Sequence, residues 1–228
     1  MRYYPAFLDL KNRPCLVIGG GQVGERKVKT LQSCGARVYL ISRELSPYLK
    51  DEVEEDRINL LAPSYDAQYL EDMFLVIGAT DDPDLNKKIS REALERRLLC
   101  NIADDPEACN FILPSLVSRG DLTIAISTAG KSPALAKKIR RDLEDRFPEI
   151  YGRYLELLGQ IRTLVLARKK PQEENQKIFE ALINAPWISW VVEEDFVPFY
   201  DLLDRLIDPP LPRSVLAEII NQLFHRHP

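Results

Sequence analysis

The chain has 228 residues, of which 45% are hydrophobic and 29% charged, and its formal net charge is −4. This length supports one large domain or two smaller ones, each with its own hydrophobic core. The negative charge disfavours nonspecific binding to nucleic acid, and no apolar run reaches the roughly 18 residues that span a bilayer. We therefore expect neither nucleic acid nor a membrane as a partner.

Cysteines and histidines limit the chemistry further. The four scattered cysteines are Cys15, Cys34, Cys100 and Cys109. Without a C-x-x-C pair, they predict reduced thiols in a cytoplasmic protein. The two histidines, His225 and His227, stand at the end of the chain, so we expect no histidine-rich metal site inside the fold and assign no metal ligands.

The first half of the chain alternates between short apolar runs and helical patterns. Strands are predicted at 15–18, 37–42, 58–62, 74–78 and 98–103, with helices that include 25–34 and 83–97. Such alternation predicts an α/β fold with a Rossmann-like parallel sheet and right-handed crossovers.

The pattern changes near residue 130. Before that point, strands at 111–117 and 122–127 flank a turn at Gly120, and Ser132-Pro133 then opens a helix to about residue 147. Further helices are predicted at 149–168, 173–184, 194–207 and 213–225, with an aromatic cluster expected to form core. We expect three parts: a Rossmann domain (1–113), a hairpin-plus-helix region (114–150) and a small all-helical C-terminal domain (151–228).

A glycine-rich loop lies between the first predicted strand and the helix after it. Residues 19–24, Gly-Gly-Gly-Gln-Val-Gly, fit G-x-G-x-x-G in the context that supports a dinucleotide site. Its glycines let the backbone approach a pyrophosphate, and the helix N-terminus attracts the anion. A plain strand-to-helix turn is the alternative. The candidate contacts are Gly19, Gly21, Gln22, Val23 and Gly24.

The adenosine ribose is expected at the end of the second strand, about 20 residues after the loop. Glu44 there can accept hydrogen bonds from the ribose hydroxyls, which favours NAD, whereas Arg43 can meet a 2′-phosphate, which favours NADP. These residues leave the choice open. Ala79 and Thr80, after the fourth strand, are the next candidate contacts.

Two carboxylates follow the fifth strand. We expect both Asp104 and Asp105 to point toward the cofactor crevice, where a carboxylate beside the nicotinamide can act as a general base. The structural alternative is a turn that caps a helix. Further on, Ser127 to Pro133 offers hydroxyls, backbone N–H groups and Lys131 before a basic helix, which suits a polyanionic small molecule. An ordinary helix cap with a solvated basic face is the alternative.

Six stretches carry a family resemblance. They lie at 4–10, 15–27, 79–82 with Asn86, 100–104, 110–114 and 126–133. In this order and spacing, over roughly residues 1–150, they resemble the precorrin-2 dehydrogenase / sirohydrochlorin ferrochelatase family, the N-terminal module of siroheme synthases. The chain ends at residue 228, so we expect the methyltransferase part of the fused siroheme synthases to be absent.

The resemblance implies a reaction and its residues. NAD would accept a hydride from the tetrapyrrole precorrin-2 to give sirohydrochlorin, and Fe2+ is a candidate substrate for a second, metal-inserting step. Asp104 would be the catalytic base in both steps, although the adjacent Asp105 leaves the working carboxylate open. The resemblance also implies a homodimer, with region 114–150 supplying much of the interface. On the tetrapyrrole side we assign Asn110, Pro114, Thr128, Gly130, Lys131 and Ser132.

Two other functions stay open at this point. One is a metal chelatase without dehydrogenase activity, and the other is a non-catalytic NAD(H)-sensing regulatory domain. A Rossmann-like fold hosts many roles, so the fold alone does not separate them.

Overall fold

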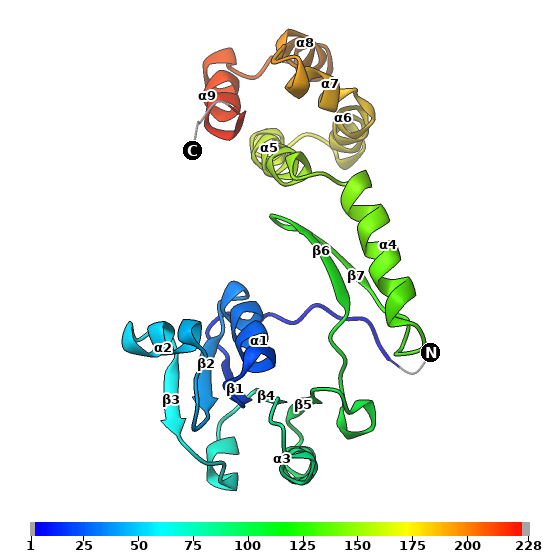
Figure 1. Cartoon of the computed structure of the whole chain (residues 1–228). Coiled ribbons are helices and arrows are strands. Elements are labelled where there is room, and N and C mark those ends of the chain that lie inside the picture. Colours follow the sequence, from blue (N-terminus) through cyan, green and yellow to red (C-terminus); the bar gives the residue numbers. More distant parts are fainter. Residues whose placement is uncertain (1–2, 225–228) are drawn as a thin grey trace. The chain divides into compact units, whose positions relative to one another are not determined.

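The computed structural model describes residues 3–224, which form two compact units. The first unit holds the residues up to Pro114 together with Ser127–Pro133. The second unit holds Ser115–Ile126 together with the residues from Ala134 onward. Figure 1 labels the helices and strands of both units.

The first unit is built on a five-stranded parallel sheet in the order β3-β2-β1-β4-β5. Ile18 at the end of β1 pairs with Ile41 on one side and Gly78 on the other, so these strands end together. The predicted Rossmann-like sheet is confirmed, with strand ends within one residue of those expected. The strands are β1 (Pro14–Ile18), β2 (Arg37–Ile41), β3 (Asn59–Ala62), β4 (Leu75–Gly78) and β5 (Leu99–Ile102).

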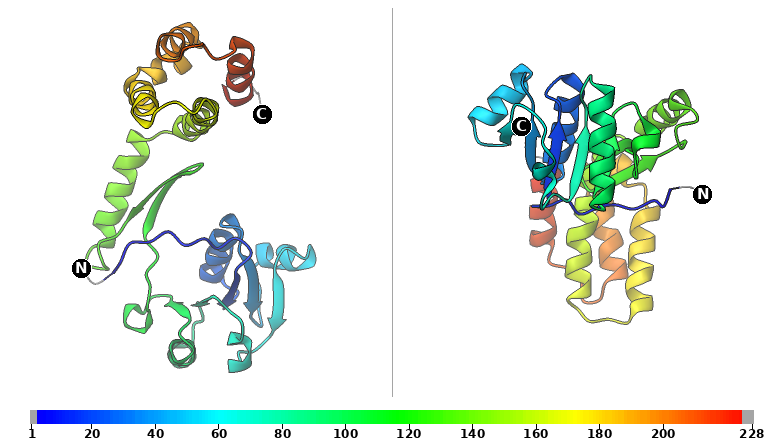
Figure 2. Two further views of the ribbon diagram at one scale, coloured as in Figure 1. Left: turned by 180° about the vertical axis from the view of Figure 1, so that it is seen from behind. Right: turned by 90° about the horizontal axis from the view of Figure 1, so that it is seen from below.

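Helices cover both faces of this sheet (Figure 2). Helices α1 (Gln22–Ser33) and α2 (Pro47–Glu54) pack on one face, and α3 (Pro83–Glu95) with the 3-10 turn η1 (Ala67–Leu70) packs on the other. Successive side chains of a strand point to opposite faces of the sheet, so each strand contributes residues to the core on both faces. Cys15 and Val17 face α1 and α2, whereas Leu16 and Ile18 face α3 and η1.

The second unit begins with an antiparallel hairpin of β6 (Ser115–Arg119) and β7 (Leu122–Ile126). Gly120 takes the left-handed conformation in its turn, with φ +59°. The prediction that β6 starts at residue 111 was wrong. The buried Asn101 side chain donates to the Phe111 carbonyl at 3.1 Å, and Phe111 packs with the core on the α1 face of the sheet instead.

Helices complete the second unit, and the last five of them share one core. Tyr154 and Trp187 stack with ring centroids 3.6 Å apart, and Phe196 and Phe199 are buried in the same core. The sequence predicts this role for the aromatic cluster. A short helix, α7, was not predicted. The helices are α4 (Pro133–Arg146), α5 (Ile150–Leu166), α6 (Gln172–Asn184), α7 (Trp187–Val192), α8 (Val197–Leu206) and α9 (Arg213–Phe224).

Between residues 3 and 224, no helix has the length and apolar character needed to cross a bilayer. The same residues contain no cluster of three or more His, Cys, Asp or Glu side chains arranged to hold a metal ion. His225 and His227 lie outside the described residues.

Candidate nucleotide cleft and acidic turn

A cleft of about 1140 Å³ opens where β1, β2 and β4 end. Its walls are the glycine loop, the segment 41–46 after β2, the segment 63–65 after β3 and the turn 79–82 after β4. Ligands of open parallel sheets bind at this edge. The structure brings eight of the predicted nucleotide contacts together on these walls: Gly19, Gly21, Gln22, Val23, Arg43, Glu44, Ala79 and Thr80.

Close packing determines the shape of the glycine loop. Gly19 has φ +115°, and a Cβ there would lie 2.2 Å from the Ala79 carbonyl oxygen. A Cβ on Gly24 would lie 1.9 Å from the Gly19 carbonyl oxygen, so Gly24 packs directly against the backbone of the loop. It does not line the cleft. A Cβ on Gly21 would meet no atom within 4 Å. The loop therefore leaves open space at the first amides of α1, which fits a pyrophosphate.

The turn after β4 is held by a buried amide. Thr80 Oγ1 donates to Asn86 Oδ1 at 2.8 Å, and Asn86 Nδ2 donates to the Thr80 carbonyl at 2.9 Å. Asn86 is buried on α3. This pair of hydrogen bonds holds Ala79 and Thr80 against the glycine loop.

The segment after β2 forms the far end of the cleft. Arg43 and Glu44 are exposed there, and Arg43 Nη2 donates to Ser64 Oγ at 3.4 Å. The Ser42 hydroxyl donates to the Glu44 carbonyl at 2.7 Å. The Ser46 amide donates to the Gly20 carbonyl at 3.0 Å, which ties the start of α2 to the glycine loop.

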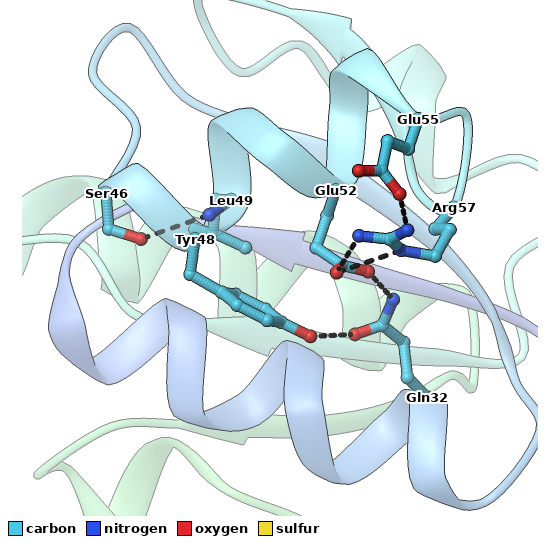
Figure 3. Close-up of polar contacts among 7 residues, drawn as sticks. All are labelled: Gln32, Ser46, Tyr48, Leu49, Glu52, Glu55 and Arg57. Carbon is cyan, nitrogen blue, oxygen red and sulfur yellow. Dashed lines mark hydrogen bonds and ion pairs between the residues drawn. The ribbon is translucent and has the colours of Figure 1, made fainter.

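A polar network joins α1 and α2 (Figure 3). Glu52 of α2 is 5% exposed and accepts from Arg57 at 2.8 and 3.0 Å and from Gln32 of α1 at 2.5 Å. The Tyr48 hydroxyl donates to Gln32 Oε1 at 3.0 Å. The hydrogen bonds from Arg57 hold the pKa of Glu52 below its usual value, despite the burial. The network therefore holds α1 and α2 together through side-chain hydrogen bonds.

The two adjacent carboxylates after β5 have different surroundings. Asp105 accepts from the Ala108 amide at 3.3 Å and lines a shallow groove with Lys87 and Arg91 of α3. Asp104 is exposed with φ +64°, and within residues 3–224 its carboxylate makes no hydrogen bond or ion pair. The expectation that both face the cofactor crevice is wrong for Asp105, because it caps the 3-10 turn η2 (Pro106–Ala108). Asp104 is also not among the residues that line the cleft.

Cys109 holds this acidic turn together. Its sulfur accepts from the Ile102 amide and donates to the Asp105 carbonyl, both at 3.1 Å. Burial raises the pKa of the Cys109 thiol, which keeps the proton needed for that donation. Sequence reasoning missed this role, because a single cysteine carries no positional signal.

Lys27 of α1 is a second residue that sequence reasoning did not single out, although it lies in the stretch 15–27. Its side chain is partly buried, and Arg26, Asp104 and Cys109 lie near enough to affect its titration. Burial lowers the pKa of Lys27, and Asp104 and Cys109 oppose that shift. Only the folded chain brings α1 and the acidic turn within electrostatic reach of each other.

The predicted tetrapyrrole contacts divide into two groups. Asn110 accepts from the Cys100 amide at 2.8 Å and donates to the Leu98 carbonyl at 2.7 Å. Its amide therefore completes the free edge of β5, and its contact with the substrate stays a prediction. Pro114 lies directly before β6 and is partly exposed.

The remaining candidates form the loop before α4. Ala129 and Gly130 are both left-handed, with φ +51° and +79°, and the Thr128 hydroxyl bonds to both the amide and the carbonyl of Ser132. Lys131 is exposed beside them. The Lys131 amide donates to the Thr128 carbonyl at 3.0 Å, so Ala129 and Gly130 form a tight turn directly before α4. Tetrapyrrole binding by this loop stays a prediction.

Comparisons with known proteins agree with this architecture. Residues 6–115 match the family model "Putative NAD(P)-binding", and residues 119–146 match "Sirohaem biosynthesis protein central". Siroheme synthase 1 of Serratia proteamaculans is 40% identical over 79% of this chain and 38% of its own length. Siroheme synthase of Zymomonas mobilis is 38% identical over 96% of this chain and 46% of its own length.

A solved structure resembles most of this chain. "SirC, precorrin-2 dehydrogenase" superposes with a TM-score of 0.75 at 26% sequence identity, covering 90% of this chain and 98% of that one. The chain spans less than half the length of the two siroheme synthases above. Sequence motifs, sheet topology and these matches agree, and the chain belongs to the precorrin-2 dehydrogenase / siroheme synthase family.

Proposed function

We propose that this chain catalyses the NAD-dependent oxidation of precorrin-2 to sirohydrochlorin, a step of siroheme biosynthesis. The observation that carries the proposal is the nucleotide cleft at the glycine loop, in a chain whose fold matches SirC over nearly the full length of both. The siroheme synthases that align with the same residues support the same pathway.

The reaction removes one hydride and one proton from the substrate. Bound NAD+ supplies the hydride acceptor. The glycine loop and the first turn of α1 would hold the pyrophosphate, and the Thr80–Asn86 pair holds the wall of the cleft after β4. Asp104 accepts the proton, because its carboxylate is exposed and uncommitted to other described residues, whereas Asp105 is engaged in capping η2.

We further propose NAD rather than NADP as the cofactor. Glu44 lies at the end of the cleft where a carboxylate accepts from the ribose hydroxyls, and a 2′-phosphate would be repelled there. Rates with NAD+ and NADP+ at matched concentrations test this choice, and Glu44→Gln should weaken the preference. A higher kcat/KM with NADP+ in the wild type would contradict it.

The decisive experiment is anaerobic turnover of precorrin-2 with NAD+, followed by NADH formation and the sirohydrochlorin spectrum. Asp104→Asn should lower kcat by about 10²- to 10⁴-fold, the usual contribution of a general base. Asp105→Asn is the matched control and should keep the wild-type rate. Nucleotide binding by the wild type without any turnover would favour the NAD(H)-sensing function instead.

A second activity, insertion of Fe2+ into sirohydrochlorin, is proposed from the names of the siroheme synthases. The exposed Asp104 carboxylate is the group that would take up the protons released as the metal enters the ring. Adding Fe2+ or Co2+ to the protein with sirohydrochlorin tests it, with Asp104→Asn as control. Chelation without dehydrogenation would favour the chelatase-only function.

We also propose a homodimer in the cytoplasm. Large apolar side chains are strongly exposed on the N-terminal arm, where Tyr4 is 88% and Phe7 75% accessible, and Leu135 of α4 is 50% accessible. All four cysteines are free thiols, which suits a reducing compartment. Sedimentation should give twice the chain mass, and Phe7→Asp should shift it toward the monomer.

A further inference from the structure

Among the described residues that line the nucleotide cleft, Tyr65 is the one aromatic side chain. It follows β3, the strand next to β2, at the end of the cleft where Arg43 and Glu44 are expected to meet the ribose. Arg43 Nη2 donates to Ser64 Oγ at 3.4 Å, which brings the segments after β2 and β3 together. The adenine of a dinucleotide is attached to that ribose, so Tyr65 lies at the adenine end of the cleft.

The surroundings of Tyr65 suit a flat ring. Tyr65 packs against the hydrophobic core on the α3 face of the sheet, and Ile41 and Leu85 of the same core also line the cleft. The glycine loop, in contrast, offers backbone groups to the cleft. Adenine has apolar faces and stacks well on an aromatic side chain.

The tip of the Tyr65 ring is fixed by a carboxylate on α3. The Tyr65 hydroxyl donates to Glu92 Oε2 at 2.7 Å, and the Glu92 side chain is only 15% exposed. Lys88, one turn earlier on α3, places its Nζ 4.0 Å from Glu92 Oε1 and 5.8 Å from the centroid of the Tyr65 ring. Burial and the bond to Glu92 raise the pKa of Tyr65, so the phenol keeps the proton that it donates.

We propose that the Tyr65 ring is the surface on which the adenine of the dinucleotide stacks, and that Glu92 is a positioning residue that holds this ring at the cleft. The inference rests on the nucleotide-binding part of the proposed function and is independent of the oxidation of precorrin-2. A tyrosine needed for core packing alone would not have to line the cleft. Tyr69 on η1 is such a residue, because it packs against the same core without lining the cleft.

Calorimetric binding of ADP-ribose tests the stacking, because this ligand carries the adenine and the pyrophosphate without the nicotinamide. Tyr65→Leu should raise the Kd about tenfold, the usual loss when a base loses its aromatic partner. Tyr65→Phe keeps the ring and should stay within about threefold of the wild type. Tyr69→Leu is the matched control and should keep the wild-type Kd. A Kd within twofold of the wild type in a folded Tyr65→Leu variant, as judged by urea unfolding, would overturn the stacking.

A double-mutant cycle tests the role of Glu92. Glu92→Ala removes the acceptor of the Tyr65 hydroxyl and should raise the Kd for ADP-ribose about threefold, whereas Glu92→Gln keeps an acceptor oxygen and should restore the wild-type Kd. In the Tyr65→Phe background, Glu92→Ala should have no further effect, because the hydroxyl is already absent. Equal losses in both backgrounds would overturn the positioning role, because Glu92 would then affect binding without acting through Tyr65.

A second measurement uses the wild-type chain and does not depend on how the leucine variant folds. With ¹³C-labelled tyrosine rings, bound ADP-ribose should give nuclear Overhauser effects between its adenine protons and one tyrosine, whose signals are missing in Tyr65→Phe. Bound ADP-ribose without these effects, or no binding at all, would overturn the stacking. If the wild type binds ADP-ribose but does not oxidise precorrin-2, the proposed function fails while these effects still decide where the adenine lies.

Discussion

The glycine loop after β1 and the acidic turn after β5 lie at the same edge of one sheet but obtain their shapes in different ways. In the loop, the absence of side chains is decisive, because Gly19 and Gly24 lie where any Cβ would strike a carbonyl oxygen. In the turn, side chains decide, because Cys109 and Asp105 bond to the backbone and Asp104 is left exposed. A loop of the first kind can be recognised from its motif, whereas a turn of the second kind depends on which backbone groups happen to lie nearby.

The largest effect is expected in the glycine loop. Gly19→Ala places a Cβ 2.2 Å from the Ala79 carbonyl oxygen at φ +115°. We expect a loss of about 3–5 kcal/mol in unfolding free energy and no measurable NADH binding, from urea unfolding and fluorescence titration. Gly21→Ala is the control and should fold normally, since its Cβ meets nothing within 4 Å. Wild-type stability in Gly19→Ala would show that the loop is not held by this close packing.

A smaller effect is expected from Cys109→Ala in the acidic turn. The substitution leaves the Ile102 amide without its acceptor and releases the Asp105 carbonyl. Unfolding free energy should fall by about 1–3 kcal/mol, and the dehydrogenation rate should fall with it, because the turn that presents Asp104 loosens. Cys109→Ser, which keeps a donor and an acceptor, should recover part of both losses. Unchanged stability in the alanine variant would mean that the thiol does not hold the turn.

Asp105→Ala tests the separation of the two carboxylates. It removes the side-chain acceptor of the Ala108 amide, and the loss of such a cap costs about 1 kcal/mol. The variant should unfold at a slightly lower urea concentration and keep the wild-type kcat. A catalytic loss as large as that of Asp104→Asn would show that the two carboxylates share the chemistry.

The last prediction concerns the pH dependence of the polar network between α1 and α2. The pKa of Glu52 is lowered in the folded state, so its contribution is present above the unfolded value of about 4.5 and is lost as the pH falls through the folded value. Wild-type unfolding free energy should therefore drop on acidification below that point. Glu52→Gln should show a shallower drop, measured by urea unfolding at several pH values. Parallel curves would mean that Glu52 does not contribute to acid unfolding.

Much of the fold follows from local sequence patterns. The strands of the parallel sheet were predicted to within one residue at each end, because buried parallel strands read as short apolar runs between turn residues. The end of α1 was equally clear. Gly35 takes φ +71°, and the amides of Gly35 and Ala36 bond to the carbonyls of Gln32 and Leu31, as a glycine after a helix allows.

Other assignments required the tertiary structure. The sequence by itself determined the parallel sheet, the glycine loop and the eight residues gathered on the cleft, because each of these residues closely follows a strand that the local pattern predicts. Only the folded chain decided that Asn110 completes the edge of β5, that Asp105 caps η2 while Asp104 remains exposed, and that Cys109 bonds to the same turn. The physical reason is that a polar side chain bonds to whatever donor or acceptor the packing of distant segments brings within reach, and spacing along the sequence does not encode that distance.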